Sequence, residues 1–113
     1  MVTVVERQKE KNPQLTIWLK DIYREKVLLG TEKEFNPIEE NKIIKGANQL
    51  HETMRRLNGR LNMMTRPIEW VNIFIDSLIE RWGTNGIYPG HLCADHSFDD
   101  VLVRYLKRKG RLG

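Results

Sequence analysis

Apolar residues recur at helical spacing along most of the chain. The first stripe on one helix face consists of Leu15, Trp18, Leu19, Ile22 and Tyr23. Asn12 precedes the stripe as a good N-cap, and Pro13 suits the first helical position. Three more apolar residues follow before Gly30, which is a typical residue after a helix end. The pattern predicts a helix over residues 13–29.

The most regular apolar pattern follows Asn36-Pro37, which repeats the same start signal. Its steps alternate between four and three residues over three heptads, at Ile43, Ala47, Leu50, Met54, Leu57, Leu61 and Met64. Asn58-Gly59 is a turn dipeptide, so a helix that ends at Leu57 is the alternative. Because the heptads continue past this dipeptide, the sequence predicts one long helix over residues 37–64. Gly46 within it is a place where another segment can cross closely.

Two further stripes complete the pattern. Pro67 restarts the chain, and the stripe up to Trp82 predicts a helix over residues 67–82 that ends at Gly83. Residues 83–96 hold three glycines and one proline and are predicted to form a long loop. Ser97 and Asp100 fit a capping box at the start of a last helix. The apolar face of that helix comprises Phe98, Val101, Leu102, Tyr105 and Leu106.

Four helices with short connections predict an all-α fold, a small four-helix bundle formed by residues 1–113 as a single domain. The helix over 37–64 is its long central element, and residues 1–11 are a lead-in with few structural signals. A single heptad seam is too narrow to bury a helix on all sides. We therefore expect another subunit, including a second copy of the chain, to complete the apolar surface. The predicted interface consists of Ala47, Leu50, Met54, Leu57, Leu61, Met64 and Trp70.

Composition limits the class of protein. Of 113 residues, 40% are apolar and 30% charged, which is ordinary for a globular domain. No stretch approaches the roughly 18 consecutive apolar residues of a membrane span, so no membrane partner is expected. The N-terminus does not have the pattern of a secretion signal, and a lone cysteine forms no internal disulfide. A cytoplasmic protein is the expectation.

Residues with site chemistry crowd together in the stretch GHLCADHSFDD, residues 90–100. Its potential zinc ligands are His91, Cys93, Asp95 and His96. Their spacing matches none of the paired patterns of zinc sites, so we expect no metal and no cofactor. We expect instead a packed loop, with its apolar centre against the helix over 67–82. Neighbouring acids disfavour a thiolate nucleophile, and no paired-acid or phosphate-loop motif occurs, so we expect no catalytic residue and no enzyme. A loop-centred metalloenzyme is the least favoured alternative.

Charge gives the strongest functional signal. The net charge is +4, and residues 41–113 carry twelve Lys or Arg against seven Asp or Glu. A basic face favours polyanionic partners through counterion release, although charge runs also serve only solubility. The candidate nucleic-acid-binding residues are Arg55, Arg56, Arg60, Arg104, Lys107, Arg108, Lys109 and Arg111. A helix-turn-helix motif is not expected, because the loop before the last helix is too long.

The sequence therefore predicts a non-catalytic small subunit of a larger assembly that binds the nucleic-acid backbone. This interpretation requires the basic residues of the second and fourth helices to converge on one outer surface. The alternative is a protein–protein adaptor or inhibitor that docks through its heptad helix and aromatic residues, without nucleic acid.

Overall fold

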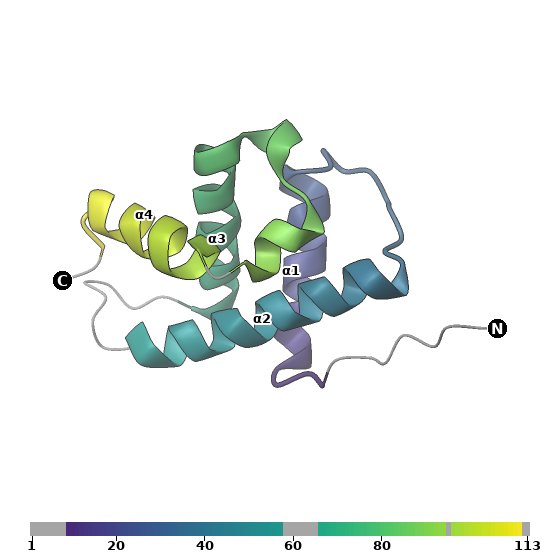
Figure 1. Cartoon of the computed structure of the whole chain (residues 1–113), viewed down its shortest axis with the longest axis horizontal. Coiled ribbons are helices and arrows are strands. Elements are labelled where there is room, and N and C mark those ends of the chain that lie inside the picture. The colour runs from purple at the N-terminus through teal and green to yellow at the C-terminus, as the bar shows by residue number, and fades with distance from the viewer. Residues whose placement is uncertain (1–8, 58–65, 95, 112–113) are drawn as a thin grey trace.

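The computed structural model describes residues 9–57, 66–94 and 96–111 (Figure 1). Apart from its connections, this part of the chain is entirely helical. The elements are α1 (Pro13–Lys26), α2 (Pro37–Leu57), α3 (Pro67–Trp82), η1 (Thr84–Gly86), η2 (Pro89–Cys93), η3 (Ser97–Leu102) and α4 (Val103–Arg108). η1 and η2 are 3₁₀ helices, and η3 is a turn of π-helix. The predicted all-α fold with four α-helices is confirmed.

The helices pack around one apolar core. α1 and α3 lie against each other, and α2 crosses in front of them in the view of Figure 1. η3 packs against α3 and continues directly into α4. All of these helices except η1 contribute fully buried side chains to this core, including Leu15, Ile43, Phe74, Leu92 and Leu106. Each Å² of buried apolar surface contributes about 25 cal/mol of stabilising free energy, so this shared core is the main source of stability.

The starts of the first three helices follow the sequence signals. A proline occupies an early position of α1, α2 and α3. The Asn12 side chain accepts hydrogen bonds from the backbone N–H groups of Gln14 and Leu15. At the start of α2, the Glu39 N–H donates to Asn36 Oδ1, and the Asn36 N–H donates to Glu39 Oε1. This reciprocal pair is a capping box, which satisfies two donors that the helix leaves open.

The end of α1 was predicted three residues too late. α1 ends at Lys26, and just beyond it the Leu28 N–H bonds to the Tyr23 carbonyl, which departs from the i→i−4 pattern of an α-helix. Leu29 and Gly30 then both take positive φ angles, 54° and 86°. Gly30 donates its N–H to the Arg24 carbonyl, so it does serve as the terminating glycine. The three apolar residues before it belong to the connection and not to the helix.

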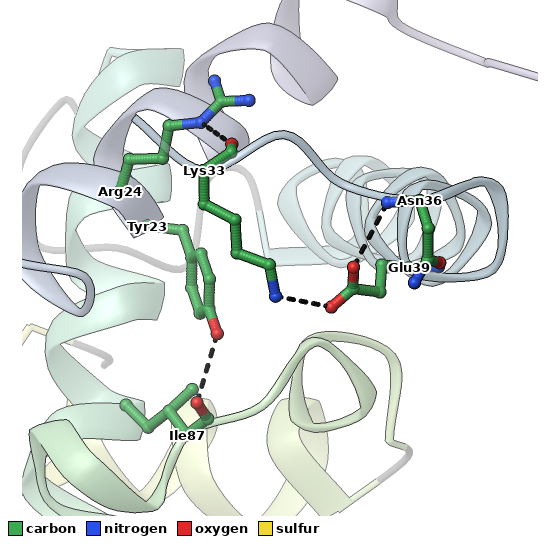
Figure 2. Close-up of polar contacts among 6 residues, drawn as sticks. All are labelled: Tyr23, Arg24, Lys33, Asn36, Glu39 and Ile87. Atoms are coloured by element: carbon green, nitrogen blue, oxygen red, sulfur yellow. Dashed lines mark hydrogen bonds and ion pairs between the residues drawn. The ribbon is translucent and has the colours of Figure 1, made fainter. Parts of the chain in front are cut away.

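Polar contacts fix the connection between α1 and α2 (Figure 2). Arg24 Nε donates to the Lys33 carbonyl at 2.9 Å. Lys33 Nζ then pairs with Glu39 Oε2, also at 2.9 Å. Because Glu39 also accepts from the Asn36 N–H, one carboxylate joins the connection to the start of α2. The connection is thus held mainly by side chains at the surface.

The α3–α4 connection is instead built into the core. The predicted long loop contains two 3₁₀ helices, and Leu92 of η2 and Ile87 between the two helices are buried. η2 lies on α2, where a Cβ at Gly46 would approach the Leu92 carbonyl carbon to 2.9 Å. Real Cβ atoms do not come this close, so only glycine permits the crossing predicted at Gly46. The predicted packing of this loop on α3 holds for η1 and for the His91 ring, which lies on Trp82, whereas η2 with Leu92 has α2 as its main neighbour.

The predicted capping box at Ser97 is also wrong. Ser97 is buried, and its hydroxyl donates to the His91 carbonyl instead of accepting from the next turn. No side chain caps η3, which begins as a π-helical turn with the Val103 N–H bonded to the Phe98 carbonyl. The serine therefore joins η2 to η3. Its local sequence resembles a cap, but a tertiary hydrogen bond occupies the hydroxyl.

Candidate nucleic-acid interface

A groove of about 860 Å³ lies between the end of α3 and α4. Its lining residues are Glu80, Arg81, His96, Asp100, Val101, Arg104, Lys107 and Arg108. Glu80 and Arg81 belong to the last turn of α3. His96 immediately precedes η3, and the remaining residues belong to η3 and α4. Two segments that are separate in sequence, the end of α3 and residues 96–108, thus supply one concave surface.

Packing of η3 and α4 on α3 positions the groove. Phe98 stacks on Phe74 of α3 with ring centroids 4.7 Å apart. Leu102 and Leu106 are completely buried, so the opposite side of α4 faces outward. Arg104 and Arg108 are four residues apart on that side and therefore neighbours on the helix surface. The buried leucines thereby direct the cations of α4 to one wall of the groove.

The groove carries more positive than negative charge. Its cations are Arg81, Arg104, Lys107 and Arg108, and its carboxylates are Glu80 and Asp100. Arg104 and Lys107 are exposed, and Arg108 forms an ion pair with Glu80 at 3.1 Å. The last turns of α3 and α4 also favour cations, because helix C-terminal ends carry partial negative charge. The net excess of two positive charges fits an anionic ligand.

Three of the eight predicted basic residues line this groove, namely Arg104, Lys107 and Arg108. Lys109 lies outside the lining, with its ammonium 5.4 Å from the centroid of the Tyr105 ring. The Arg111 N–H donates to the Leu106 carbonyl just after α4. The cations of α4 therefore divide between the groove and the segment beyond it.

The basic residues of α2 are not brought into the groove. Arg55 and Arg56 are exposed on the last turn of α2, and neither lines the groove. Arg60 falls outside the described residues. In Figure 1, α4 and the end of α2 both lie at the left of the view. The described groove nevertheless joins α4 to α3, whereas the sequence prediction joined it to α2.

Arg81 and His96 are groove residues that the sequence prediction did not include. Arg81 stands in the last turn of α3, where a cation is ordinary. His96 was considered only as a metal ligand. Its ring lies edge-on to Trp82, with centroids 5.4 Å apart. Only the packing of η3 on α3 brings these two residues beside the cations of α4.

The predicted subunit interface is largely buried within the chain itself. Ala47, Leu50, Leu57 and Trp70 are each at most 4% exposed. Met54 is partly buried against the same core, and Leu61 and Met64 fall outside the described residues. The described part of the seam faces α1 and the short helix η2. The partner that the heptad pattern requires is therefore supplied, over this range, by the chain's own segments.

The loop residues that were considered as zinc ligands make other contacts. His91 Nδ1 accepts a hydrogen bond from the Tyr88 N–H at 3.0 Å, and Cys93 Sγ donates to the Gly90 carbonyl at 3.5 Å. The His91 ring also packs on Trp82, with centroids 4.6 Å apart. Asp95 falls outside the described residues. Across the described ranges, no three His, Cys, Asp or Glu side chains gather in a group that fits a metal ion.

Among the helices of the described residues, none combines the length and the apolar character that a membrane span requires. Comparisons with family models, curated proteins and solved structures find no match to this chain. Functional inference therefore depends on the geometry and charge of the groove.

Proposed function

We propose that the chain is a non-catalytic, nucleic-acid-binding protein that holds the phosphate backbone in the groove between α3 and α4. The observation that supports this proposal is the gathering of four cationic side chains from two helices around one concave surface. Arginine presents donors in a planar fork that matches two phosphate oxygens, and three of the four cations are arginines. The site is proposed to act within a larger assembly, as a backbone-binding subunit.

The form of the groove favours contact with the backbone over reading of bases. The cations are exposed and come from the ends of α3 and α4. α4 itself comprises only six residues and is anchored through its buried Leu106. Contacts of this kind position a nucleic acid without specifying its sequence. Affinity should therefore depend steeply on salt and weakly on sequence.

A protein–protein adaptor is the second candidate function, and the two carboxylates of the groove favour it. Glu80 and Asp100 would repel a phosphate but would attract basic side chains of a protein. The buried heptad seam cannot supply the docking surface over its described range, because its residues are already covered. An adaptor that docks through the groove would instead use charges of both signs.

Binding of a labelled mixed-sequence oligonucleotide across a salt series tests the proposed function. The variant Arg104→Glu/Lys107→Glu reverses two exposed groove cations that are three residues apart on α4. The matched control Lys42→Glu/Lys45→Glu reverses two exposed cations at the same spacing on α2, away from the groove. Both variants change the net charge equally.

We expect the groove variant to weaken binding at least tenfold at low salt, because two phosphate contacts become repulsive. The plot of log affinity against log salt should become flatter, and the magnitude of its slope should decrease by about 1–2 for the loss of two contacts. The control should retain most of the affinity and the slope. Equal losses in both variants would show general charge attraction only, and absence of binding at low salt would favour the adaptor.

A further inference from the structure

One cation of the groove is already paired with an acid of the chain. Arg108 Nη1 on α4 lies 3.1 Å from Glu80 Oε1 on α3, so the ion pair joins the two sides of the groove. Both side chains remain accessible, at 59% and 38% exposure. An incoming anion can therefore reach Arg108. It would meet a guanidinium that is already neutralised by a carboxylate.

We infer that Glu80 is an internal competitor of the ligand, which a phosphate must displace from Arg108. The inference rests on the proposed function, because it requires phosphate groups in this groove. Carboxylate and phosphate bind the same kind of guanidinium donor, so the two anions compete at Arg108, where Glu80 already holds Nη1. Glu80 thereby sets the affinity of the groove and the class of anion that it accepts.

The exchange at Arg108 selects for extended polyanions. A single phosphate ion that displaces Glu80 gains one charged contact and removes another. A phosphodiester chain gains further contacts with Arg104 and Lys107, which the same groove presents as exposed cations. These added contacts offset the loss of the internal pair. The ligand class that fits is therefore a chain of linked phosphates, and not an isolated one.

The variant Glu80→Gln removes the competing charge and keeps the size of the side chain. Exposed ion pairs are weak, so a phosphate displaces Glu80 at little cost. Removal of the Glu80 charge should therefore raise oligonucleotide affinity by only about three- to tenfold at low salt. A freed Arg108 should also add close to one phosphate contact, which steepens the salt slope by about 0.7–0.9. The improvement for inorganic phosphate should be smaller.

Asp76→Asn is the matched control on the same helix. Asp76 lies one turn before Glu80 on α3 and pairs with Lys26 of α1 at 2.8 Å, with 43% of its side chain exposed. It does not line the groove. The control thus removes an equal charge from another interhelical ion pair of α3, whose carboxylate is similarly exposed and whose lysine is more buried than Arg108. It separates release of Arg108 from a general increase in positive charge.

The experiment compares oligonucleotide binding by the wild-type chain, Glu80→Gln, Asp76→Asn, Arg108→Ala and the double variant Glu80→Gln/Arg108→Ala. We expect Glu80→Gln to exceed Asp76→Asn in affinity and slope, and we expect its gain to disappear when Arg108 is absent. Wild-type binding with equal gains in the two acid variants would overturn the inference and leave the proposed function standing. Absence of wild-type binding would overturn both. Denaturant unfolding of each variant confirms that it is folded.

Discussion

Within the described residues, the connection after α1 and the connection after α3 are ordered in different ways. The connection after α1 is held by polar side chains at the surface, with Arg24, Lys33 and Glu39 as its main contacts (Figure 2). The connection after α3 places Ile87 and Leu92 in the core and brings η2 onto α2. Surface ion pairs contribute little to stability, whereas a buried leucine contributes several kcal/mol. Val27 at the start of the first connection also joins the core, but the second connection places a completely buried leucine there, and it leads into the groove.

A leucine in each connection provides the sharpest test of this difference. Leu92→Ala should reduce the free energy of unfolding by about 2–5 kcal/mol, because it leaves a cavity at a fully buried position. Leu29→Ala should change it by less than about 0.5 kcal/mol, because Leu29 is 79% exposed. Urea unfolding followed by circular dichroism measures both. Similar values for the two variants would contradict the assignment of η2 to the core.

Tyr23→Phe tests the contact between α1 and the second connection. The Tyr23 hydroxyl donates to the Ile87 carbonyl at 3.1 Å, as Figure 2 shows. Its loss leaves a buried carbonyl without this donor and should cost about 0.5–1.5 kcal/mol in urea unfolding at neutral pH. A neutral result would mean that the Ile87 carbonyl finds another donor.

The same variant has a pH signature. Burial raises the pKa of the Tyr23 phenol above its ordinary value of 10.0, and the charges of Glu39 and Tyr88 raise it further. The unfolded chain therefore releases this proton first, and stability is lost as the pH rises above 10.0. The phenylalanine has no proton to release. The stability difference between wild type and Tyr23→Phe should accordingly shrink above that pH.

Glu39→Gln tests the polar connection and should give the smallest effect. A hydrogen bond from Lys33, followed by one from the Asn36 N–H, lowers the pKa of the Glu39 carboxyl below its ordinary value of 4.5. Its stabilising contribution is therefore complete above pH 4.5 and is lost as the pH falls through the lower, folded-state pKa. Because Lys33 is largely exposed, we expect a loss of less than about 1 kcal/mol at neutral pH.

The loss caused by Glu39→Gln should vanish in acid, when the wild-type carboxyl is also neutral. Thermal unfolding at pH 7 and at pH values below 4 measures the difference. Glu34→Gln, an equal charge change at an exposed residue of the same connection, is the control. A pH dependence shared by both variants would show a general charge effect.

Local signals in the sequence predicted much of the fold. The Asn12-Pro13 and Asn36-Pro37 pairs mark the starts of α1 and α2 because capping depends on neighbouring residues only. Ser97 has an equally good local signal, yet its hydroxyl bonds to the His91 carbonyl from the preceding segment. Where a side chain has two possible hydrogen-bond partners, the tertiary structure decides which partner it binds. Local signals likewise did not predict the end of α1 at Lys26.

The candidate site was predictable only in part, for a related reason. The outward direction of Arg104, Lys107 and Arg108 follows from the apolar face of their own helix, which the sequence reveals. The presence of Arg81 and Glu80 opposite them depends on how η3 packs on α3, which no local pattern encodes. The heptad pattern likewise identified an apolar seam but not its cover. Periodicity predicts which side of a helix is buried, and not by what.

The crossing at Gly46 also provides a way to recognise distant relatives of this chain. Any chain that keeps η2 over the middle of its second helix must leave room there for the Leu92 main chain, and a single methyl group removes that room. A homologue with diverged charges and a different groove would still need glycine at this crossing. The pairing of that glycine with a proline-started short helix after α3 is therefore a more durable signature of ancestry than the basic residues themselves.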